Sequence, residues 1–183
     1  GFKELDNLRV KSFKSFETQG FPTKRQEHWK YTDIKNIISN NFQNLQIFNK
    51  NEVSHYNNEL LVKEFEHNKI ILLNGKFVES NFTLENEEKI KIKSLKAIFE
   101  NKNDFNKLKN YFEDEQNSLI LLNHALTNDG ILLDIEDNYS FNKPLVIYNF
   151  FDKMVENKIV NNKFFISLGE KSNLSLVDFY SCE

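Results

Sequence analysis

The stretch Gly20–Ile37, with the sequence GFPTKRQEHWKYTDIKNI, indicates a break between two helices. Gly20 is the residue type that ends a helix in the left-handed conformation, and Pro22 prevents a helix from continuing through it. Thr23 stands three residues before Gln26, which is the spacing of a capping box, so we expect a new helical turn to start at Thr23. The stretch therefore predicts a helix, a corner and a second helix.

Apolar residues recur at helical spacing on both sides of this corner. The first helix is predicted from four of them and should end at Gly20: Leu5, Leu8, Phe13 and Phe16. The second helix, which Thr32 or Asp33 can cap, carries Ile34, Ile37, Ile38 and Phe42. Trp29 is predicted to anchor the joint between the helices. Arg25, Glu27 and Lys30 could hold the corner through ion pairs or face a partner subunit, but solvated charges are the prediction.

Beyond residue 68 the pattern changes to a hairpin and short helices. The apolar run Lys69–Leu73, the turn dipeptide Asn74-Gly75 and the extended run Lys76–Val78 predict a β-hairpin. Ile90 and Ile92 alternate with lysines, as in a half-buried strand. Helical spacing then returns up to Phe112, with an interruption predicted near Asn101–Asp104. The polar run between residues 49 and 68 is predicted to be a connector.

From residue 119 onward the sequence favours strands. A short buried helix is predicted over Leu119–Leu126, closed by a turn at Asn128-Asp129-Gly130. Four short strands are predicted after it: Ile131–Ile135, Leu145–Phe150, Lys163–Leu168 and Leu174–Tyr180. Regular short strands occur in sandwiches, barrels and β-solenoids, and periodicity alone does not choose among these folds.

Composition excludes some classes of partner. The formal net charge is -3, and the lysines are scattered among glutamates and asparagines. Nucleic-acid and anionic-membrane surfaces need a concentrated basic patch, so neither partner is expected. The single cysteine, Cys182, excludes an internal disulfide and favours a reducing compartment. No apolar run approaches the roughly 20 residues that span a bilayer.

Residues that often carry chemistry are present but are not grouped. Cys182 has no base near it in sequence, so a buried small residue is expected there rather than a nucleophile or cluster ligand. Four histidines lie far apart, without metal-ligand spacing: His28, His55, His67 and His124.

Two loop motifs are incomplete. The run Gly169–Ser172 is similar to the tail of a phosphate-binding loop but lacks the upstream glycine, so a tight turn is expected. The run Ala125–Glu136 has glycine and glutamate at calcium-loop positions, but alanine occupies the first ligand position. No carboxylate pair stands in contrasting surroundings. We therefore predict no catalytic, metal-binding or cofactor-binding residue.

Nine residues of the opening stretch resemble the N-terminal signature of the SufB/SufD family, and of its SufD branch in particular. They are Gly20, Pro22, Thr23, Arg25, Glu27, Trp29, Lys30, Tyr31 and Thr32. The family supplies subunits of the SufBCD iron–sulfur cluster assembly complex. Later stretches, such as KIILLNGKFVES at residues 69–80, are similar to the family as well. The signature residues are interpreted as structural.

This resemblance implies an α+β fold, with a helical N-terminal domain followed by the first coils of a right-handed parallel β-helix (β-solenoid). The implied boundaries are residues 1–118 for the mainly helical domain with its small hairpin and residues 119–183 for the truncated start of the β-helix. The chain starts at Gly1 without methionine and stops at Glu183 within a strand-like run. We therefore expect a piece of a longer protein that self-associates, when isolated, through its open β-helix end.

The resemblance also implies a non-catalytic scaffold that pairs with a SufB-like subunit and a SufC-like ABC ATPase. The iron–sulfur cluster would be handled by the full complex, with no cofactor in residues 1–183, in the cytoplasm or in the plastid of a eukaryote. Two alternatives stay open: a SufB-like paralogue, and a β-solenoid enzyme or interaction domain whose active residues lie beyond Glu183. Among the strands, only Asp134 and Asp178 are candidates for carbohydrate chemistry.

Overall fold

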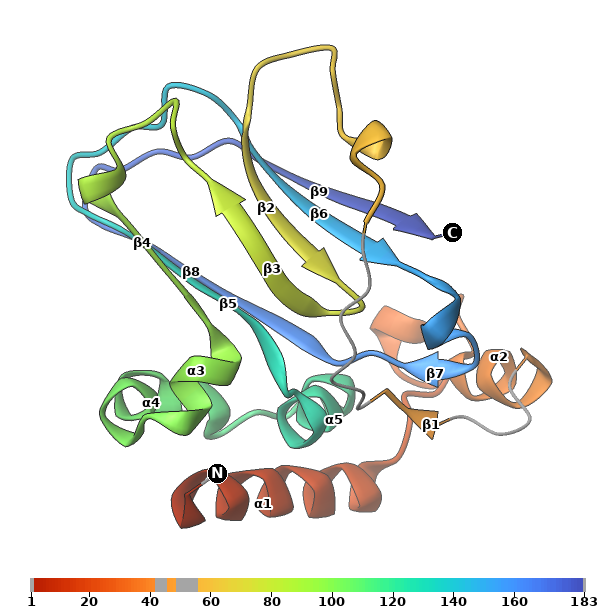
Figure 1. Ribbon diagram of the computed structural model, residues 1–183. Helices are drawn as coiled ribbons and strands as arrows, with labels where there is room; N and C mark the ends of the chain where they lie inside the picture. The colour runs from red at the N-terminus through yellow and green to blue at the C-terminus, as the bar shows by residue number, and fades with distance from the viewer. Residues whose placement is uncertain (1, 42–45, 49–55, 183) are drawn as a thin grey trace. The chain divides into compact units, whose positions relative to one another are not determined.

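The computed structural model describes residues 2–41, 46–48 and 56–182, and structural statements concern these residues. Two compact units alternate along the chain (Figure 1). The helical unit comprises residues 1–46 and 96–128, and the strand unit comprises residues 47–95 and 129–183. Among the described residues, no helix is both long enough and apolar enough to cross a membrane.

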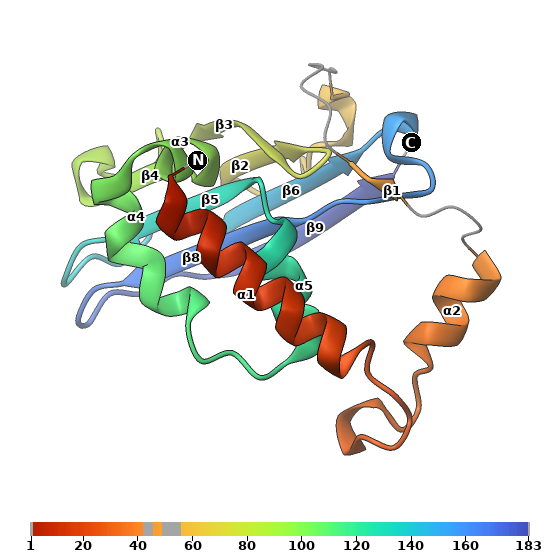
Figure 2. The ribbon, with the colours of Figure 1, turned by 90° about the horizontal axis from the view of Figure 1, so that it is seen from below.

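The helical unit begins with the predicted first helix. Its α-helices are α1 (Lys3–Gln19), α2 (Ile34–Asn41), α3 (Leu95–Glu100), α4 (Lys102–Leu108) and α5 (Ser118–Leu126). Helix α1 lies alongside α5 (Figure 2). The predicted interruption is confirmed, because the Asn101 side chain accepts hydrogen bonds from the first turn of α4. Asn117 caps α5 in the same way, and such caps typically stabilise a helix by about 1 kcal/mol.

Three phenylalanines form the aromatic centre of the helical unit. The rings of Phe99, Phe105 and Phe112 lie 5.9–6.3 Å apart, centroid to centroid, and all three side chains are buried. The Arg9 guanidinium lies 5.3 Å from the Phe99 centroid and donates from Nη2 to the Thr127 carbonyl at 2.6 Å. Burial lowers the pKa of Arg9, but the cation retains a carbonyl and an aromatic face as partners.

Among the described residues, the strand unit contains two larger sheets. Their strands are β2 (Asn68–Leu73), β3 (Lys76–Asn81), β4 (Ile90–Ser94), β5 (Asp129–Ile135), β6 (Leu145–Phe151), β8 (Asn162–Leu168) and β9 (Leu176–Cys182). The first sheet has the order β3-β2-β6-β9 and the second has the order β4-β5-β8. Two short strands, β1 (Gln46–Ile47) and β7 (Lys158–Ile159), lie outside these sheets. The predicted hairpin is confirmed as the antiparallel pair of β2 and β3.

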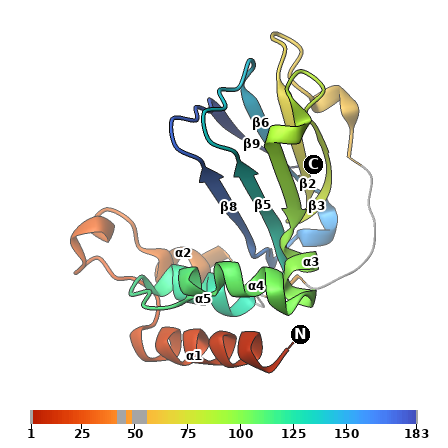
Figure 3. The same cartoon turned by 90° about the vertical axis from the view of Figure 1, so that its left-hand side faces the viewer.

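Parallel pairs repeat along the later strands. Asp129 of β5 pairs with Asn162 of β8, and Leu145 of β6 pairs with Leu176 of β9. A parallel bridge joins Ser140 to Asn173 between these strands. The chain thus runs from the second sheet to the first, and repeats that path 31 to 33 residues later. Figure 3 shows the two sheets as separate layers.

Side chains from both sheets meet in one apolar core. Its buried members are Ile70, Leu72, Phe82, Ile90, Ile131, Leu133, Ile135, Leu145 and Ile147. They follow the period of two along each strand, because alternate side chains of a strand point to one face. One face of each of these strands therefore faces this core, and the opposite face of β2 and β6 is buried in a second apolar cluster.

Gly130 allows β5 and β8 to approach closely. Its φ is 138°, and a Cβ atom there would lie 1.9 Å from the Lys163 carbonyl oxygen. The predicted turn at Asn128-Asp129-Gly130 is wrong, because β5 already begins at Asp129. The local sequence signals a turn, whereas pairing with β8 extends the backbone.

The compact units differ from the division expected at residues 118 and 119. The hairpin was expected with the helices, but β2 pairs in parallel with β6 in the strand unit. The partner of β2 lies 77 residues further along the chain (Asn68 to Leu145), and no local pattern specifies such a partner. The domain boundary and the β-helix stay predictions.

Candidate functional site

The candidate site is the elbow, which we define as residues 20–33. Gly20 ends α1 with φ 69°, and its N–H donates to the Phe16 carbonyl at 2.6 Å. The Phe21 ring packs edge-on against Phe16 at 5.2 Å, and Pro22 is buried. The predicted end of the first helix is therefore confirmed.

The middle of the elbow differs from the predicted capping box. The Gln26 N–H donates to the Thr23 carbonyl at 3.0 Å, which closes a turn through the backbone rather than through the side chains. A 3-10 helix follows at Glu27–Trp29, and no side-chain hydrogen bond caps it. The prediction of a helical turn from Thr23 is wrong because Pro22 and the tight turn delay it. Asp33 does cap α2, since its Oδ1 accepts from the Asn36 N–H at 3.0 Å.

Most signature side chains of the elbow face solvent. Thr23, Arg25, Glu27, Lys30, Tyr31 and Thr32 are exposed, and the Tyr31 side chain reaches 89% exposure. Trp29 is half-buried, so the buried anchor predicted for it stays a prediction. Arg25, Glu27 and Lys30 are exposed to solvent, as predicted, and Lys30 also forms an ion pair: its Nζ lies 2.5 Å from Glu27 Oε1 and 5.1 Å from the Tyr31 ring centroid.

This arrangement suits recognition better than catalysis. The elbow presents an exposed tyrosine next to charges of both signs, including Lys24 at 3.8 Å from Asp33. Exposed ion pairs contribute little stability, typically below about 1 kcal/mol. Aromatic side chains and arginine are enriched in protein interfaces. The exposed side chains of the elbow contribute little to stability and are therefore available to contact a partner.

The cysteine and the histidines do not form a reactive centre. Cys182 is exposed on β9, which corrects the prediction of a buried residue; among the described strands, β9 pairs with β6 and lies at the edge of its sheet. His28 is exposed, His124 is buried 4.8 Å from the Phe112 ring, and His55 lies outside the described residues. Across residues 2–41, 46–48 and 56–182, no group of three or more His, Cys, Asp or Glu side chains could hold a metal ion.

The two incomplete loop motifs have structural explanations. The run Gly169–Ser172 is the tight turn that was predicted, since the Ser172 N–H donates to the Gly169 carbonyl at 3.1 Å. Lys171 adopts a left-handed φ of 57° within it. The run Ala125–Glu136 passes from the end of α5 into β5 and forms no ion-binding loop.

The two aspartates considered for carbohydrate chemistry lie on different sheets. Asp134 belongs to β5 in the second sheet, and Asp178 belongs to β9 in the first. Asp178 accepts from Asn149 Nδ2 at 2.7 Å and from the Tyr180 hydroxyl at 3.0 Å. The Asp178 oxygens thus accept hydrogen bonds from side chains of the same sheet. Because Asp134 lies on the other sheet, the two carboxylates do not form an acid–base pair.

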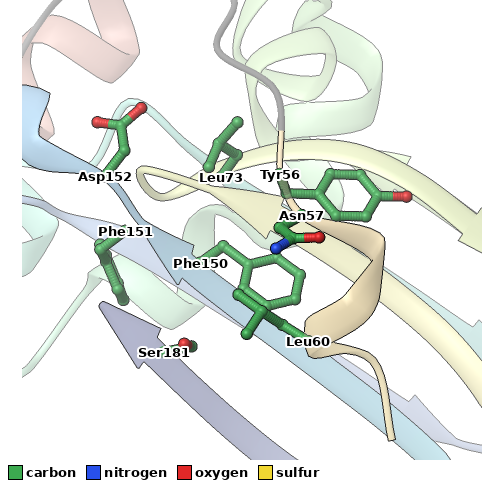
Figure 4. A pocket seen from close by; sticks show the side chains of 8 residues that line it. All are labelled: Tyr56, Asn57, Leu60, Leu73, Phe150, Phe151, Asp152 and Ser181. Atoms are coloured by element: carbon green, nitrogen blue, oxygen red, sulfur yellow. The ribbon is translucent and has the colours of Figure 1, made fainter. Parts of the chain in front are cut away.

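Of two depressions among the described residues, one is too small for a cofactor and the other is open to solvent. A crevice in the strand unit encloses about 10 Å³, the space of one water molecule, whereas ligand pockets measure about 300–1,000 Å³. Figure 4 shows its lining, in which the Tyr56 ring stacks on Phe150 at 5.4 Å. A shallow depression of about 420 Å³ in the helical unit is open to solvent. It mixes positive and negative side chains along α1 and beyond: Lys3, Glu4, Asn7, Leu8, Lys11, Lys102 and Glu113.

Sequence reasoning missed a carboxylate that joins its own loop to the β5–β6 connection and to the start of β2. Glu85 accepts from the Tyr139 hydroxyl at 2.7 Å, from Asn68 Nδ2 at 2.8 Å and from the N–H groups of Asn142 and Lys143 at 3.0 Å. Burial alone would raise the pKa of Glu85, but these hydrogen bonds together lower it. Its partners lie 17 to 58 residues away, so no local spacing could have revealed them.

The match to a family model agrees with the resemblance. Residues 2–147 match the family described as SufBD protein N-terminal region. A phosphopantetheine adenylyltransferase from Wigglesworthia glossinidia brevipalpis is 27% identical over 134 residues, which cover 69% of this chain and 78% of that protein. That identity is too low to transfer an activity. The family match covers most of the chain, so the protein belongs to the SufB/SufD family of non-catalytic scaffolds of iron–sulfur cluster assembly, and residues 2–147 are its N-terminal region.

Proposed function

We propose that this chain is the N-terminal part of a SufD-type scaffold that pairs with a SufB-like subunit and a SufC-like ATPase. The carrying observation is the family match over residues 2–147, which includes the elbow. The nine signature residues favour the SufD branch over the SufB branch. The work of such a scaffold is to orient partners, and the exposed elbow suits that role.

The fold that belongs to this proposal is a helical domain followed by the first coils of a right-handed parallel β-helix. The parallel pairs β5 with β8 and β6 with β9 support it, because one coil of a solenoid pairs with the next in parallel. Right-handed crossovers are the rule for parallel strands in one sheet. Hydrogen exchange on the full-length protein tests it: amides of β8 and β9 should be protected on both edges.

Copurification tests the proposed partners. The full-length protein, tagged on this chain, is co-expressed with SufB-like and SufC-like proteins from the same genome. We expect stoichiometric recovery of both partners. Recovery of this chain alone would contradict the proposed assembly while leaving family membership intact.

A paired substitution tests whether the elbow contributes to assembly. Arg25→Ala with Tyr31→Ala removes the exposed cation and ring from the elbow, and it should weaken copurification of a partner. Tyr111→Ala is the matched control, because Tyr111 is a tyrosine of the helical unit with 64% exposure. Equal recovery with both variants would place the partner contacts elsewhere.

A SufB-like role is the second candidate, because both branches share the family. The two branches differ in whether the subunit carries a cluster on cysteines. Anaerobic cluster reconstitution on the isolated full-length subunit distinguishes them. A SufD-type chain should retain no stoichiometric iron or sulfide; stable retention of both would favour the SufB-like role.

The proposed site of action is the cytoplasm, or the plastid in a eukaryote. Cluster assembly needs reduced thiols, and the single cysteine agrees with a reducing compartment. A fluorescent fusion of the full-length protein, compared with a secreted control fusion, checks this assignment.

A further inference from the structure

A segment that we call the strap, residues 56–67, covers the outer face of the first sheet. That face is apolar and buried, with Ile71, Leu73, Val146, Tyr148 and Phe150. The strap packs four side chains onto it: Tyr56, Leu60, Leu61 and Val62. The strap contains only a short 3-10 helix (Asn58–Leu60), so side-chain contacts hold most of it in place.

Two hydrogen bonds fasten the strap at Tyr148, and a third within the strap orients His67. The Val62 N–H donates to the Tyr148 hydroxyl oxygen at 3.0 Å. The same hydroxyl lies 2.7 Å from His67 Nε2, and His67 Nδ1 lies 2.9 Å from the Phe65 carbonyl. A carbonyl only accepts, so Nδ1 carries a proton, and Nε2 of the neutral ring is an acceptor. The Tyr148 hydroxyl therefore donates to His67 while it accepts from Val62.

Protonation of His67 conflicts with this arrangement. With a proton on Nε2, both neighbours of the Tyr148 hydroxyl become donors, and its own O–H loses its acceptor. Tyr148 has 0% exposure, so the displaced O–H cannot turn to water without movement of the strap. A buried donor without a partner is unfavourable, and separation of the strap from the sheet relieves it.

The glutamates near the strap and Tyr56 have partners of their own. Lys143 lies 2.8 Å from Glu66, and Lys69 lies 3.0 Å from Glu79. These contacts lower the pKa values of both glutamates. Backbone N–H groups lower the pKa of Glu64, and burial with the Glu79 bond raises the pKa of Tyr56 to about 12. Lysine side chains as a class are charged at neutral and mildly acidic pH.

We propose that His67 and Tyr148 form a pH-sensitive latch that holds the strap on the first sheet near neutral pH and releases it in mild acid. Histidine is the side chain that changes charge between about pH 5 and 8, so it is the switching group. Release uncovers the apolar ring surface of Tyr148 and Phe150. The latch is independent of whether the chain is SufD-type or SufB-type.

Hydrogen exchange across this pH range tests the latch on the full chain. The protection factor of the Val62 amide, which corrects for the pH dependence of intrinsic exchange, is measured at pH 7.5 and pH 5.5. We expect it to fall about tenfold at pH 5.5, the size expected for the loss of one buried hydrogen bond. Amides of β5 and α5 should keep their protection and serve as internal controls.

Two variants separate the latch from general acid sensitivity. His67→Gln keeps an acceptor oxygen but does not titrate, so protection at Val62 should stay high at both pH values. Tyr148→Phe removes both bonds and should give low protection at both. His28→Gln alters an exposed histidine of the elbow and should leave the wild-type pH response unchanged.

Two results would overturn the proposal. One is equal Val62 protection at pH 7.5 and 5.5 in the wild-type chain. The other is a fall in His67→Gln as large as in the wild type. If Tyr148→Phe fails to fold, the His67→Gln comparison decides the question alone.

Discussion

The elbow and the paired sheets of the strand unit differ in what their residues do. The elbow carries the residues that identify the family, yet most of them are exposed and bond only within a few residues of one another. The sheets are built from ordinary Ile, Leu, Val and Phe residues, yet these form the buried core. Identity and stability are thus carried by different parts of the chain. Substitutions in the sheets should destabilise, whereas substitutions in the elbow should alter recognition.

Gly130→Ala should have the largest effect on stability. The added Cβ would collide with the Lys163 backbone. The backbone cannot shift to remove this collision easily, because Gly130 has a positive φ and is paired with Lys163 in the sheet. We expect a loss of about 4–5 kcal/mol or more in the free energy of unfolding, measured by urea titration. Gly20→Ala is the matched control in the elbow: its φ is also positive, but nothing lies within 4 Å of the added atom. It should cost about 1–3 kcal/mol through backbone strain alone.

Phe105→Ala should have the next largest effect. The ring has 0% exposure at the centre of the helical unit, and loss of such a ring costs about 3–5 kcal/mol. Trp29→Ala removes a larger ring from the elbow, but that ring is half-buried, so we expect about 1 kcal/mol. The free energy of unfolding of both variants is measured by thermal and urea unfolding. A loss in Trp29→Ala as large as that in Phe105→Ala would mean that Trp29 is a core anchor.

Glu85→Gln should have an intermediate, pH-dependent effect. The lowered pKa of Glu85 means that its ionised form stabilises the fold. That stability is present above the ordinary glutamate pKa and is lost as the pH falls through the lowered folded-state pKa. At pH 7 the variant should lose about 1–2 kcal/mol, because one accepting oxygen becomes a donor. The difference from the wild type should vanish in acid; a constant difference down to pH 3 would contradict the role of ionised Glu85.

Tyr31→Ala should change stability least. With 89% exposure, its loss should shift the free energy of unfolding by less than about 0.5 kcal/mol. Partner recovery in the copurification should fall in the same variant. A large loss of stability in Tyr31→Ala would contradict the inference that the elbow contributes to recognition and the sheets to stability.

Local structure was predicted well because its causes are local. Gly20, Asp33, Asn74-Gly75 and Asn101 act within a few residues, and each is found in the expected turn or cap. The exceptions are also informative. Thr23 and Gln26 form a backbone turn in place of a capping box, and Asn128-Asp129-Gly130 enters a strand because β8 pairs with it. Competing pairing outweighs a local turn preference.

The sequence by itself determined the family, the helix ends, the hairpin and the positions of the later strands, since periodicity and turn chemistry are properties of short segments. Only the tertiary structure decided that β2 joins β6, that Glu85 binds the β5–β6 connection and the start of β2, and that Tyr148 holds the strap through His67. These contacts join residues up to 86 positions apart. Such pairings depend on which segments exclude water together, and that choice is made by the folded chain as a whole.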